Sequence, residues 1–200
     1  MVGSHETMPG MSRKATSQKT AKSRLTVDDW IAGALALLRR EGVGAIRIPR
    51  LCEELGVTKG SFYWHFDDVD QLLEAITDYW CGTQNDAVRG LSELESLSVA
   101  ERLEVMGTRL TSESAWTVES TVRDWARTNE RVAKAVRELD LRIFEVIQKS
   151  LLELDLTPEQ ARTRAGVLVF AGIGFVHGHD SLPTPSAADM RELFSVLMRK

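Results

Sequence analysis

Apolar residues recur at steps of three and four along almost the whole chain after residue 25. This spacing is typical of helices that bury one face and leave the other in water. The first such stretch begins at Thr26 and ends at Gly42, and the second runs from Ile48 to Gly56 with Pro49 in its first turn. No stretch shows the period-two alternation of a half-buried strand, so the pattern predicts an all-α protein.

A third, very short helix is predicted inside the stretch GVTKGSFYWHF, residues 56–66. Gly56 provides a tight turn, Thr58 can cap the helix, and Val57 can pack against Phe62 as a hydrophobic staple. Phe62 and Phe66 lie four positions apart and share the inner face. The outer and lateral faces are left to Lys59, Gly60, Ser61, Tyr63, Trp64 and His65. Three helices with a short glycine turn before the third predict a helix-turn-helix, whose last helix enters the DNA major groove.

Further apolar-periodic segments follow at about residues 68–90, 98–112, 115–128, 130–154, 157–177 and 186–199. The expected fold is a three-helix helix-turn-helix domain followed by a larger helical domain, with about nine helices. We expect a flexible basic arm at 1–24, the helix-turn-helix domain at 25–70 and the carboxy-terminal domain at 71–200.

The formal net charge of −4 is unevenly distributed along the chain. Residues 1–66 hold ten Lys and Arg against six Asp and Glu, whereas residues 67–200 hold 15 against 23. A basic front and an acidic rear suggest that only the front faces DNA, although a solvated surface without a partner would give the same counts.

Composition excludes several other classes of protein. Hydrophobic residues make up 43% of the chain and charged residues 27%, as in soluble globular proteins. No apolar run is long enough to span a bilayer and no secretion-signal pattern follows the amino end, so we expect a cytoplasmic protein without a membrane partner. Cys52 and Cys81 lie in predicted helices without a CxxC partner, which argues against disulfides and a cysteine zinc site. No cofactor is expected.

The second helix, the stretch GVTKGSFYWHF and the following DDVDQLLEAI together resemble the TetR family of one-component bacterial transcription regulators. The resemblance covers about residues 26–75. Its most specific part is the run aromatic-Tyr-x-His-Phe followed by a helix with two leucines. The resemblance implies a homodimer with an amino-terminal DNA-binding domain and a carboxy-terminal domain for effector binding and dimerisation. In the family, a bound effector usually changes the separation of the two DNA-reading helices and releases the DNA.

Carried over by position, the resemblance implies that Lys59, Gly60 and Tyr63 touch base edges. It implies that Ser61, Trp64 and His65 contact phosphates. The chemistry agrees, because a lysine can donate to guanine, glycine permits close backbone approach, and serine or histidine can donate to phosphate. The alternative is that these rings pack the three-helix core, and for Trp64 the sequence leaves both interpretations open.

Two places depart from the family pattern. Val69 stands where a phosphate-holding lysine is common, and Ile48 and Pro49 stand where threonine and a polar residue are common. We expect the basic arm, with Arg47 and Arg50, to bind phosphates in their place. The candidate DNA-binding residues are therefore Arg47, Arg50, Thr58, Lys59, Gly60, Ser61, Tyr63, Trp64 and His65.

Large apolar side chains in the rear helices could line an effector pocket with a few polar anchors. The candidates are Trp80, Gln84, Met106, Leu110, Trp116, Trp125, Phe144, Ile147 and Phe170, with Cys81, Arg123 and Asn129 nearby in sequence. Ordinary core packing is the alternative for each of them. As a set they favour a small hydrophobic or aromatic effector.

Two features of the segment AGIGFVHGHD and the residues before it need separate interpretations. His177, His179 and Asp180 are potential metal ligands, but residues two apart point to different faces of a helix, so no metal site is expected.

Small residues in the predicted helix 157–177 allow close helix packing: Ala165, Gly166, Ala171, Gly172 and Gly174. The resemblance implies that the last two helices pair across a twofold axis in a four-helix bundle, and packing within one chain is the alternative.

The sequence therefore predicts a ligand-responsive repressor that binds a pseudo-palindromic operator in double-stranded DNA as a homodimer. It is not expected to be an enzyme, because no catalytic triad, phosphate-cradling glycine loop or supported carboxylate pair is visible. An architectural DNA-binding dimer without an effector would share the same front end and is the main alternative.

Overall fold

The computed structural model describes residues 24–86, 91, 96–110, 113–178, 181–183 and 185–199 of the 200-residue chain. Within these residues the secondary structure consists of nine α-helices and two short 3-10 turns, without a strand, which confirms the all-α fold class. The amino-terminal elements are α1 (Val27–Glu41), η1 (Val43–Ala45), α2 (Ile48–Leu55), α3 (Lys59–Phe62) and α4 (Val69–Cys81). The remaining elements are η2 (Thr83–Asn85), α6 (Val99–Leu110), α7 (Glu113–Ala126), α8 (Glu130–Leu152), α9 (Pro158–Gly178) and α10 (Ala187–Met198).

The first helix begins and ends where local chemistry predicts. The Thr26 hydroxyl accepts a hydrogen bond from the backbone N–H of Asp29 at 3.2 Å, and the Asp29 carboxylate accepts from the Thr26 N–H at 2.7 Å. This reciprocal capping box satisfies two donors at the helix start, and its hydrogen bonds lower the pKa of Asp29. Gly42 ends the helix with a φ of 78°, a conformation that favours glycine.

Aromatic packing holds the short third helix against the first. The Trp30 ring meets the rings of Phe62 and Phe66 almost edge-on, with centroids 5.3 and 6.4 Å apart. All three side chains are buried. Gly33 lets α1 and α2 approach closely, because a Cβ there would come within 2.7 Å of Leu55 Cδ2. These contacts give α2 and α3 a rigid base.

The fourth helix is shorter than the segment 68–90 predicted for it. It ends at Cys81, and Gly82 adopts an extended backbone before η2. The backbone oxygens at this end find partners outside the helix, because the Asn85 amide donates to the Trp80 carbonyl and Arg142 donates to the Cys81 carbonyl. These side-chain contacts replace the backbone hydrogen bonds that a longer helix would have made. The apolar spacing along the sequence does not predict such contacts.

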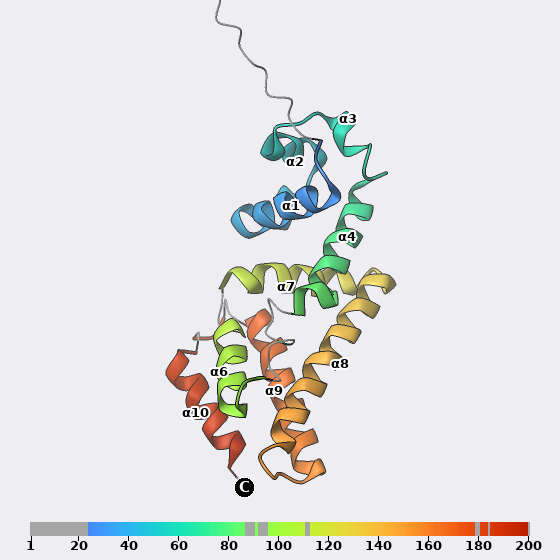
Figure 1. Cartoon of the computed structure of the whole chain (residues 1–200). Helices are drawn as coiled ribbons and strands as arrows, with labels where there is room; N and C mark the ends of the chain where they lie inside the picture. Colours follow the sequence, from blue (N-terminus) through green and yellow to red (C-terminus); the bar gives the residue numbers. More distant parts are fainter. Residues whose placement is uncertain are drawn as a thin grey trace, which may run out of the picture.

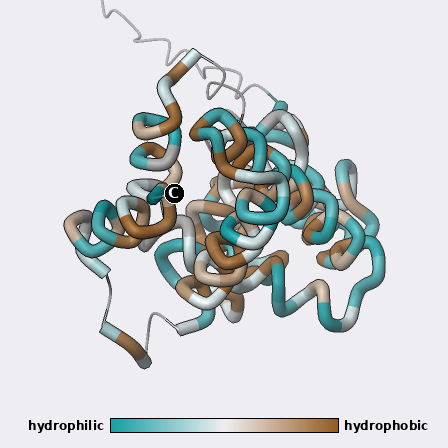
Figure 2. The backbone as a smooth tube through the Cα atoms, turned by 90° about the horizontal axis from the view of Figure 1, so that it is seen from below, coloured by the Kyte–Doolittle hydropathy of each residue, from teal (hydrophilic) through white to brown (hydrophobic). Residues whose placement is uncertain are grey.

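In Figure 1 the helix-turn-helix part lies above α7, and α8, α9, α6 and α10 extend below it. One hydrophobic core runs without interruption from α1 through α4 and α7 into the first half of α8. A second core joins α6, the end of α8, α9 and α10. Figure 2 shows brown and teal stretches alternating along the helices, as expected where each helix buries one face. Among the helices described, none is long and apolar enough to cross a membrane.

Candidate DNA-binding surface and effector cavity

The outer side of α3 and of the turn after it is exposed. Lys59 and Gly60 are exposed, and the side chains of Tyr63 and Trp64 keep 57% and 66% of their surface accessible. Phe62, directly before Tyr63, is fully buried and meets its ring edge-on at 5.5 Å. The predicted division between inner and outer faces is therefore present, and Phe62 anchors the residues that stand outside.

Gly60 is not required by packing within the chain. A Cβ added there would meet only Thr58 Oγ1, at an ordinary distance of 3.7 Å, and its backbone is not among those with positive φ. Glycine also costs about 1 kcal/mol relative to alanine inside a helix. Packing within the described residues therefore gives no reason for glycine at this position.

The structure excludes core packing, one of the two interpretations of Trp64. The ring does not pack into the three-helix core, and the Arg24 guanidinium carbon lies 3.1 Å from its centroid. This is a cation–π contact on the surface. It places Arg24, the first described residue at the end of the basic arm, next to the turn that follows α3.

Two residues differ from expectation. His65 is half-buried between Trp30 and Trp64, with ring centroids 6.5 and 5.7 Å away, and its Nε2 is inaccessible. The histidine was predicted on the outer face, but the turn after Phe62 rotates it towards α1.

Thr58 precedes α3 as predicted but makes no side-chain capping bond, and its side chain is exposed. Ser61 is half-buried.

The arginines near α2 have different environments. Arg50 donates from Nε and Nη2 to the Glu41 carboxylate, at 3.1 and 2.6 Å, and lies 3.3 Å from Glu54. Arg40 donates to Glu54 at 2.7 Å. A phosphate would therefore have to displace Glu41 from Arg50. Arg47 is exposed at the start of α2 and is the better placed of the two predicted arginines.

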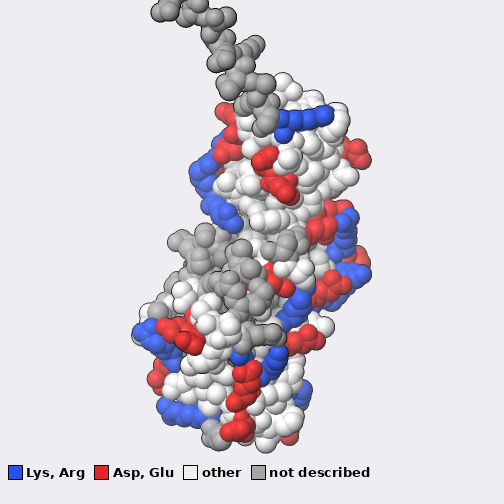
Figure 3. Space-filling model, in the orientation of Figure 1, with Lys and Arg blue, Asp and Glu red and all other residues white. Residues whose placement is uncertain are grey.

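Most of the predicted basic surplus lies outside the described residues. Residues 24–66 hold six Lys and Arg against five Asp and Glu. On the face shown in Figure 3, charges of both signs are interspersed over the upper and lower parts of the molecule. We therefore expect most of the electrostatic attraction to DNA to come from the basic residues before Arg24, which are Arg13, Lys14, Lys19 and Lys22.

A cavity of about 210 Å³ lies among the rear helices and the end of α4. Four of the predicted lining residues surround it: Trp80, Met106, Trp116 and Ile147. Three others do not. Trp125 packs against the first core, Phe144 packs against the second, and Phe170 is 75% exposed. The side chains of Gln84 and Leu110 lie outside what the structure describes. Cys81 is buried, and Asn129 caps α8.

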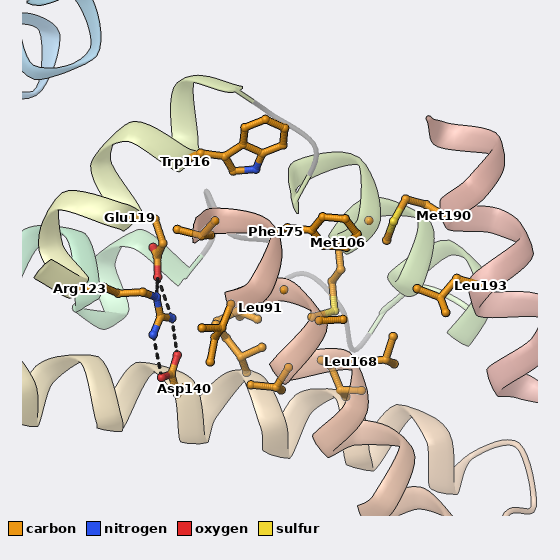
Figure 4. A pocket seen from close by; sticks show the side chains of 18 of the residues that line it. Leu91, Met106, Trp116, Glu119, Arg123, Asp140, Leu168, Phe175, Met190 and Leu193 are labelled. Atoms are coloured by element: carbon orange, nitrogen blue, oxygen red, sulfur yellow. Dashed lines mark hydrogen bonds and ion pairs between the residues drawn. The ribbon is translucent and has the colours of Figure 1, made fainter. Parts of the chain in front are cut away.

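The polar end of the cavity is a hydrogen-bonded cluster (Figure 4). Arg123 of α7 donates to Glu119 one turn earlier at 3.0 Å, and to both oxygens of Asp140 of α8 at 2.6 and 3.0 Å. Trp80 of α4 donates through Nε1 to Glu119 at 2.7 Å. Glu119 and Asp140 were not predicted as site residues. The four-residue spacing of Glu119 and Arg123 was a signal available in the sequence, whereas the pairing with Asp140 depends on how α7 meets α8.

No group of three or more His, Cys, Asp or Glu side chains is close enough to hold a metal ion in the described part of the chain. His177 lies at the end of α9 and is exposed. His179 and Asp180 lie outside the described residues.

One face of α9 is apolar and uncovered. From Ala165 to Val176 the helix carries no polar side chain, yet Val167 and Phe170 are 48% and 75% exposed. Gly174, one turn further along the same side, is also exposed, and a Cβ there would meet open space. Exposed apolar faces of this kind mark interaction surfaces.

Residues 31–76 match the family model described as bacterial regulatory proteins, tetR family. The HTH-type transcriptional repressor Rv1353c of Mycobacterium tuberculosis is 34% identical over 61 residues, 30% of this chain. That match spans only 23% of the relative's own length. The HTH-type transcriptional regulator AcrR of Shigella flexneri is 25% identical over 182 residues, 81% of this chain and 79% of the relative.

Solved structures share the fold over most of the chain. A transcriptional regulator from Rhodococcus sp. Rha1 superposes with a TM-score of 0.71 at 18% identity, covering 87% of this chain and 94% of that one. The multidrug binding protein EbrR, solved with imidazole, gives 0.60 at 17% identity, covering 87% and 95%. BioQ, solved with its double-stranded DNA operator, gives 0.51 at 19% identity, covering 87% and 98%.

The fold and the exposed third helix define a class of protein, the helical proteins in which an amino-terminal helix-turn-helix precedes a larger helical domain. Within that class the match over α1–α4 is specific. Residues 31–76 match the TetR family of bacterial regulatory proteins, and most of the chain shares its fold with a solved transcriptional regulator.

Proposed function

We propose that the chain is a transcriptional regulator that binds double-stranded DNA through α3 and the turn after it. One observation carries the proposal: Lys59, Tyr63 and Trp64 stand exposed around a helix whose Phe62 is fully buried. Residues 25–70 would form the DNA-binding domain. A helix held in this way can present its outer side chains to the major groove without losing its position.

The binding unit we propose is a homodimer that recognises a pseudo-palindromic operator. The uncovered apolar face of α9 supports this, because burying Val167 and Phe170 against a second copy would remove them from water. A twofold axis there would place one α3 on each half-site, so that the operator repeats in inverted orientation. The carboxy-terminal residues, 71–200, would then provide the dimer contacts.

The regulatory signal we propose is a small, mostly apolar effector in the cavity that releases the DNA. Trp80 belongs to α4, the helix that directly follows the helix-turn-helix, and it lines the cavity. Arg131 of α8 is bonded to Glu74 and Asp78 of α4. An effector that favours a different position of α4 would therefore change how the DNA-binding domain is held. Action on chromosomal DNA would place the protein in the cytoplasm.

Selection of bound DNA from a random library tests the proposal. A regulator of the proposed kind is expected to recover an inverted repeat, and a molecule from a metabolite panel is expected to reduce binding to that repeat. Recovery of unrelated sequences with no shared repeat would instead favour an architectural DNA-binding protein.

The Gly60→Ala variant tests the contact through α3. The fold leaves room for the added methyl group, so the free energy of unfolding is expected to stay the same or rise by up to about 1 kcal/mol. Operator affinity is expected to fall by about tenfold or more, because the methyl group obstructs backbone approach. Gly44→Ala is a matched control, since Gly44 is also exposed and a Cβ there would meet no atom within 4 Å. Equal affinities for the two variants would contradict the proposed contact.

A further inference from the structure

An asparagine borders the cavity at the end of α4. Asn85 belongs to η2, the turn after that helix, and only 3% of its surface is exposed. Among the described residues that line the cavity, it is the only one whose side chain is uncharged and carries an oxygen. A buried amide is costly to the fold unless its polar atoms are bonded. The hydrogen bonds of Asn85 therefore indicate what its side chain does.

The side-chain nitrogen of Asn85 has a partner within the chain. Nδ2 donates to the Trp80 carbonyl in the last turn of α4 at 3.2 Å. The backbone N–H of Asn85 donates to the Gly82 carbonyl at 3.1 Å, which closes the turn. Because a carbonyl oxygen can only accept, the branch of the amide that faces Trp80 is the nitrogen and the other branch is Oδ1.

The side-chain oxygen of Asn85 is in a different situation. No described residue donates a hydrogen bond to Oδ1. The described side-chain atoms that are sealed from solvent and also lack a hydrogen-bond partner are Trp30 Nε1, His65 Nε2, Arg102 Nε and Arg142 Nε. Asn85 Oδ1 is not one of them, so the small exposed part of the residue includes this oxygen. Since Asn85 lines the cavity, a molecule inside it can reach Oδ1.

The charged side chains at the cavity are bonded to one another. The three guanidinium nitrogens of Arg123 donate to Glu119 or Asp140, and both oxygens of Asp140 accept from Arg123. A ligand that bound to Arg123 or Asp140 would have to replace one of these bonds. A ligand that donates to Asn85 leaves the cluster unchanged.

We propose that Asn85 selects effectors that carry an O–H or N–H donor on an otherwise apolar body, such as an alcohol, a phenol or an amide. The inference rests on the proposed role of the cavity as an effector site and adds the group that the effector must carry. A donor bonded to Oδ1 satisfies a buried acceptor that the described residues leave open. The apolar body lies among side chains such as Met106, Met190 and Leu193, which Figure 4 shows away from the charged cluster.

The position of Asn85 links this hydrogen bond to the proposed regulation. Its amide holds the Trp80 carbonyl in the last turn of α4, and α4 directly follows the helix-turn-helix. A ligand that fixes the amide through Oδ1 therefore also acts on the end of that helix.

Pairs of isomers with and without a donor test the selection. 5-Phenylpentan-1-ol and 1-methoxy-4-phenylbutane have the same composition, but only the alcohol can donate a hydrogen bond. Further alcohol–ether pairs with naphthyl and n-alkyl bodies cover other shapes. In calorimetric titrations of the full chain, the alcohol of each pair that binds is expected to bind about tenfold tighter than its ether.

Two variants separate the acceptor from the structural bond to Trp80. Asn85→Leu removes both, and it is expected to reduce the alcohol-to-ether affinity ratio to about one; Asn85→Ala serves if it does not fold. Asn85→Asp also removes the N–H that donates to Trp80 but keeps an acceptor oxygen, so the ratio is expected to stay at about tenfold. Thr83→Leu is the matched control, because Thr83 is an exposed residue of the same turn that does not line the cavity.

Some outcomes would overturn the inference alone, because the cavity would still bind ligands. These are equal affinities for the alcohol and the ether in every pair that binds, and an unchanged ratio in Asn85→Leu. Loss of the preference in Asn85→Asp as well would assign it to the bond with Trp80 and not to the acceptor. If no probe bound to a chain that still bound its operator, the inference and the proposed effector site would both be overturned.

Discussion

Phe62, the last residue of α3, and the adjacent Tyr63 have opposite environments, so their roles can be tested separately. Phe62 is inaccessible to water and touches Trp30 and Phe66, whereas most of the adjacent Tyr63 side chain is in solvent. A helical turn places consecutive side chains about 100° apart, so a buried residue can directly precede an exposed one. Substitutions one position apart can therefore distinguish anchoring from contact with DNA.

Phe62→Ala is expected to lower the free energy of unfolding by about 3–5 kcal/mol, because it leaves a cavity between α1 and α3. Tyr63→Ala is expected to change stability by no more than about 1 kcal/mol and yet to weaken operator binding clearly. Urea denaturation and fluorescence anisotropy with labelled operator would measure the two effects. A stable Phe62→Ala protein, or a Tyr63→Ala protein with full affinity, would contradict this assignment.

At the scale of elements, four charged side chains tie α1 to α2. Glu41 lies between Arg40 and Arg50, at 3.1 and 2.6 Å, and Glu54 pairs with Arg40 at 2.7 Å. Hydrogen bonds from Arg50 and Arg40 lower the pKa of Glu41, and the bond from Arg40 lowers that of Glu54. Since Arg40 and Glu41 are exposed and Arg50 and Glu54 are only half-buried, the contribution of each pair to stability is small.

The lowered pKa values predict a pH dependence with a defined sign. A carboxylate whose pKa is lower in the folded state stabilises the fold above its ordinary pKa of about 4.3. That stabilisation is lost as the pH falls through the folded-state value, when Glu41 and Glu54 become protonated. The difference in stability between the parent and a Glu41→Gln, Glu54→Gln variant is therefore expected to shrink below pH about 4. Denaturant titrations at several pH values would measure it, and a difference independent of pH would contradict the assignment.

The basic arm is a second element whose role can be measured. The described helix-turn-helix residues are nearly neutral, so most of the attraction to phosphates is expected from Arg13, Lys14, Lys19 and Lys22. Deleting residues 1–24 is expected to weaken operator binding and to flatten the dependence of log K on log salt, by about 0.9 for each phosphate that the arm neutralises. An unchanged salt slope after the deletion would assign phosphate binding to the folded domain instead.

At the scale of the whole molecule, α9 has apolar residues on both sides although only one side is covered within the chain. Ala161, Ala165 and Leu168 are buried in the second core, while Val167 and Phe170 face outwards. A helix that is apolar all round is normally buried all round. A second copy of the chain would complete that burial.

Phe170→Glu is expected to shift the protein towards a monomer in sedimentation experiments, because a carboxylate would be placed in the proposed dimer interface. Operator affinity should fall with it, since two linked half-sites bind more tightly than one. Val43→Glu is the matched control, because Val43 is also an exposed apolar residue but lies in η1. Sedimentation of Phe170→Glu as the parent species would place the interface elsewhere.

Many of the helix boundaries of this protein were predictable from local sequence. The capping residues Thr26 and Ser186, the left-handed Gly56, and the three- and four-residue apolar spacing all act over short distances along the chain. They determine where helices begin and end, and in residues 56–66 they also determine which rings face inwards. The all-α fold and the family resemblance were therefore predictable from sequence.

Contacts between distant elements were decided only by the tertiary structure. Arg50 was expected to meet phosphate but is paired with Glu41 of α1, and Phe170 was expected in the pocket but lies on the surface. Asp140 reaches Arg123 only because α7 crosses α8 at that point. Helical periodicity says that a side chain is on the apolar or polar side of its own helix. Whether that side chain then lies in a core, lines a cavity or contacts a partner depends on how the helices pack together. No local sequence pattern contains that information.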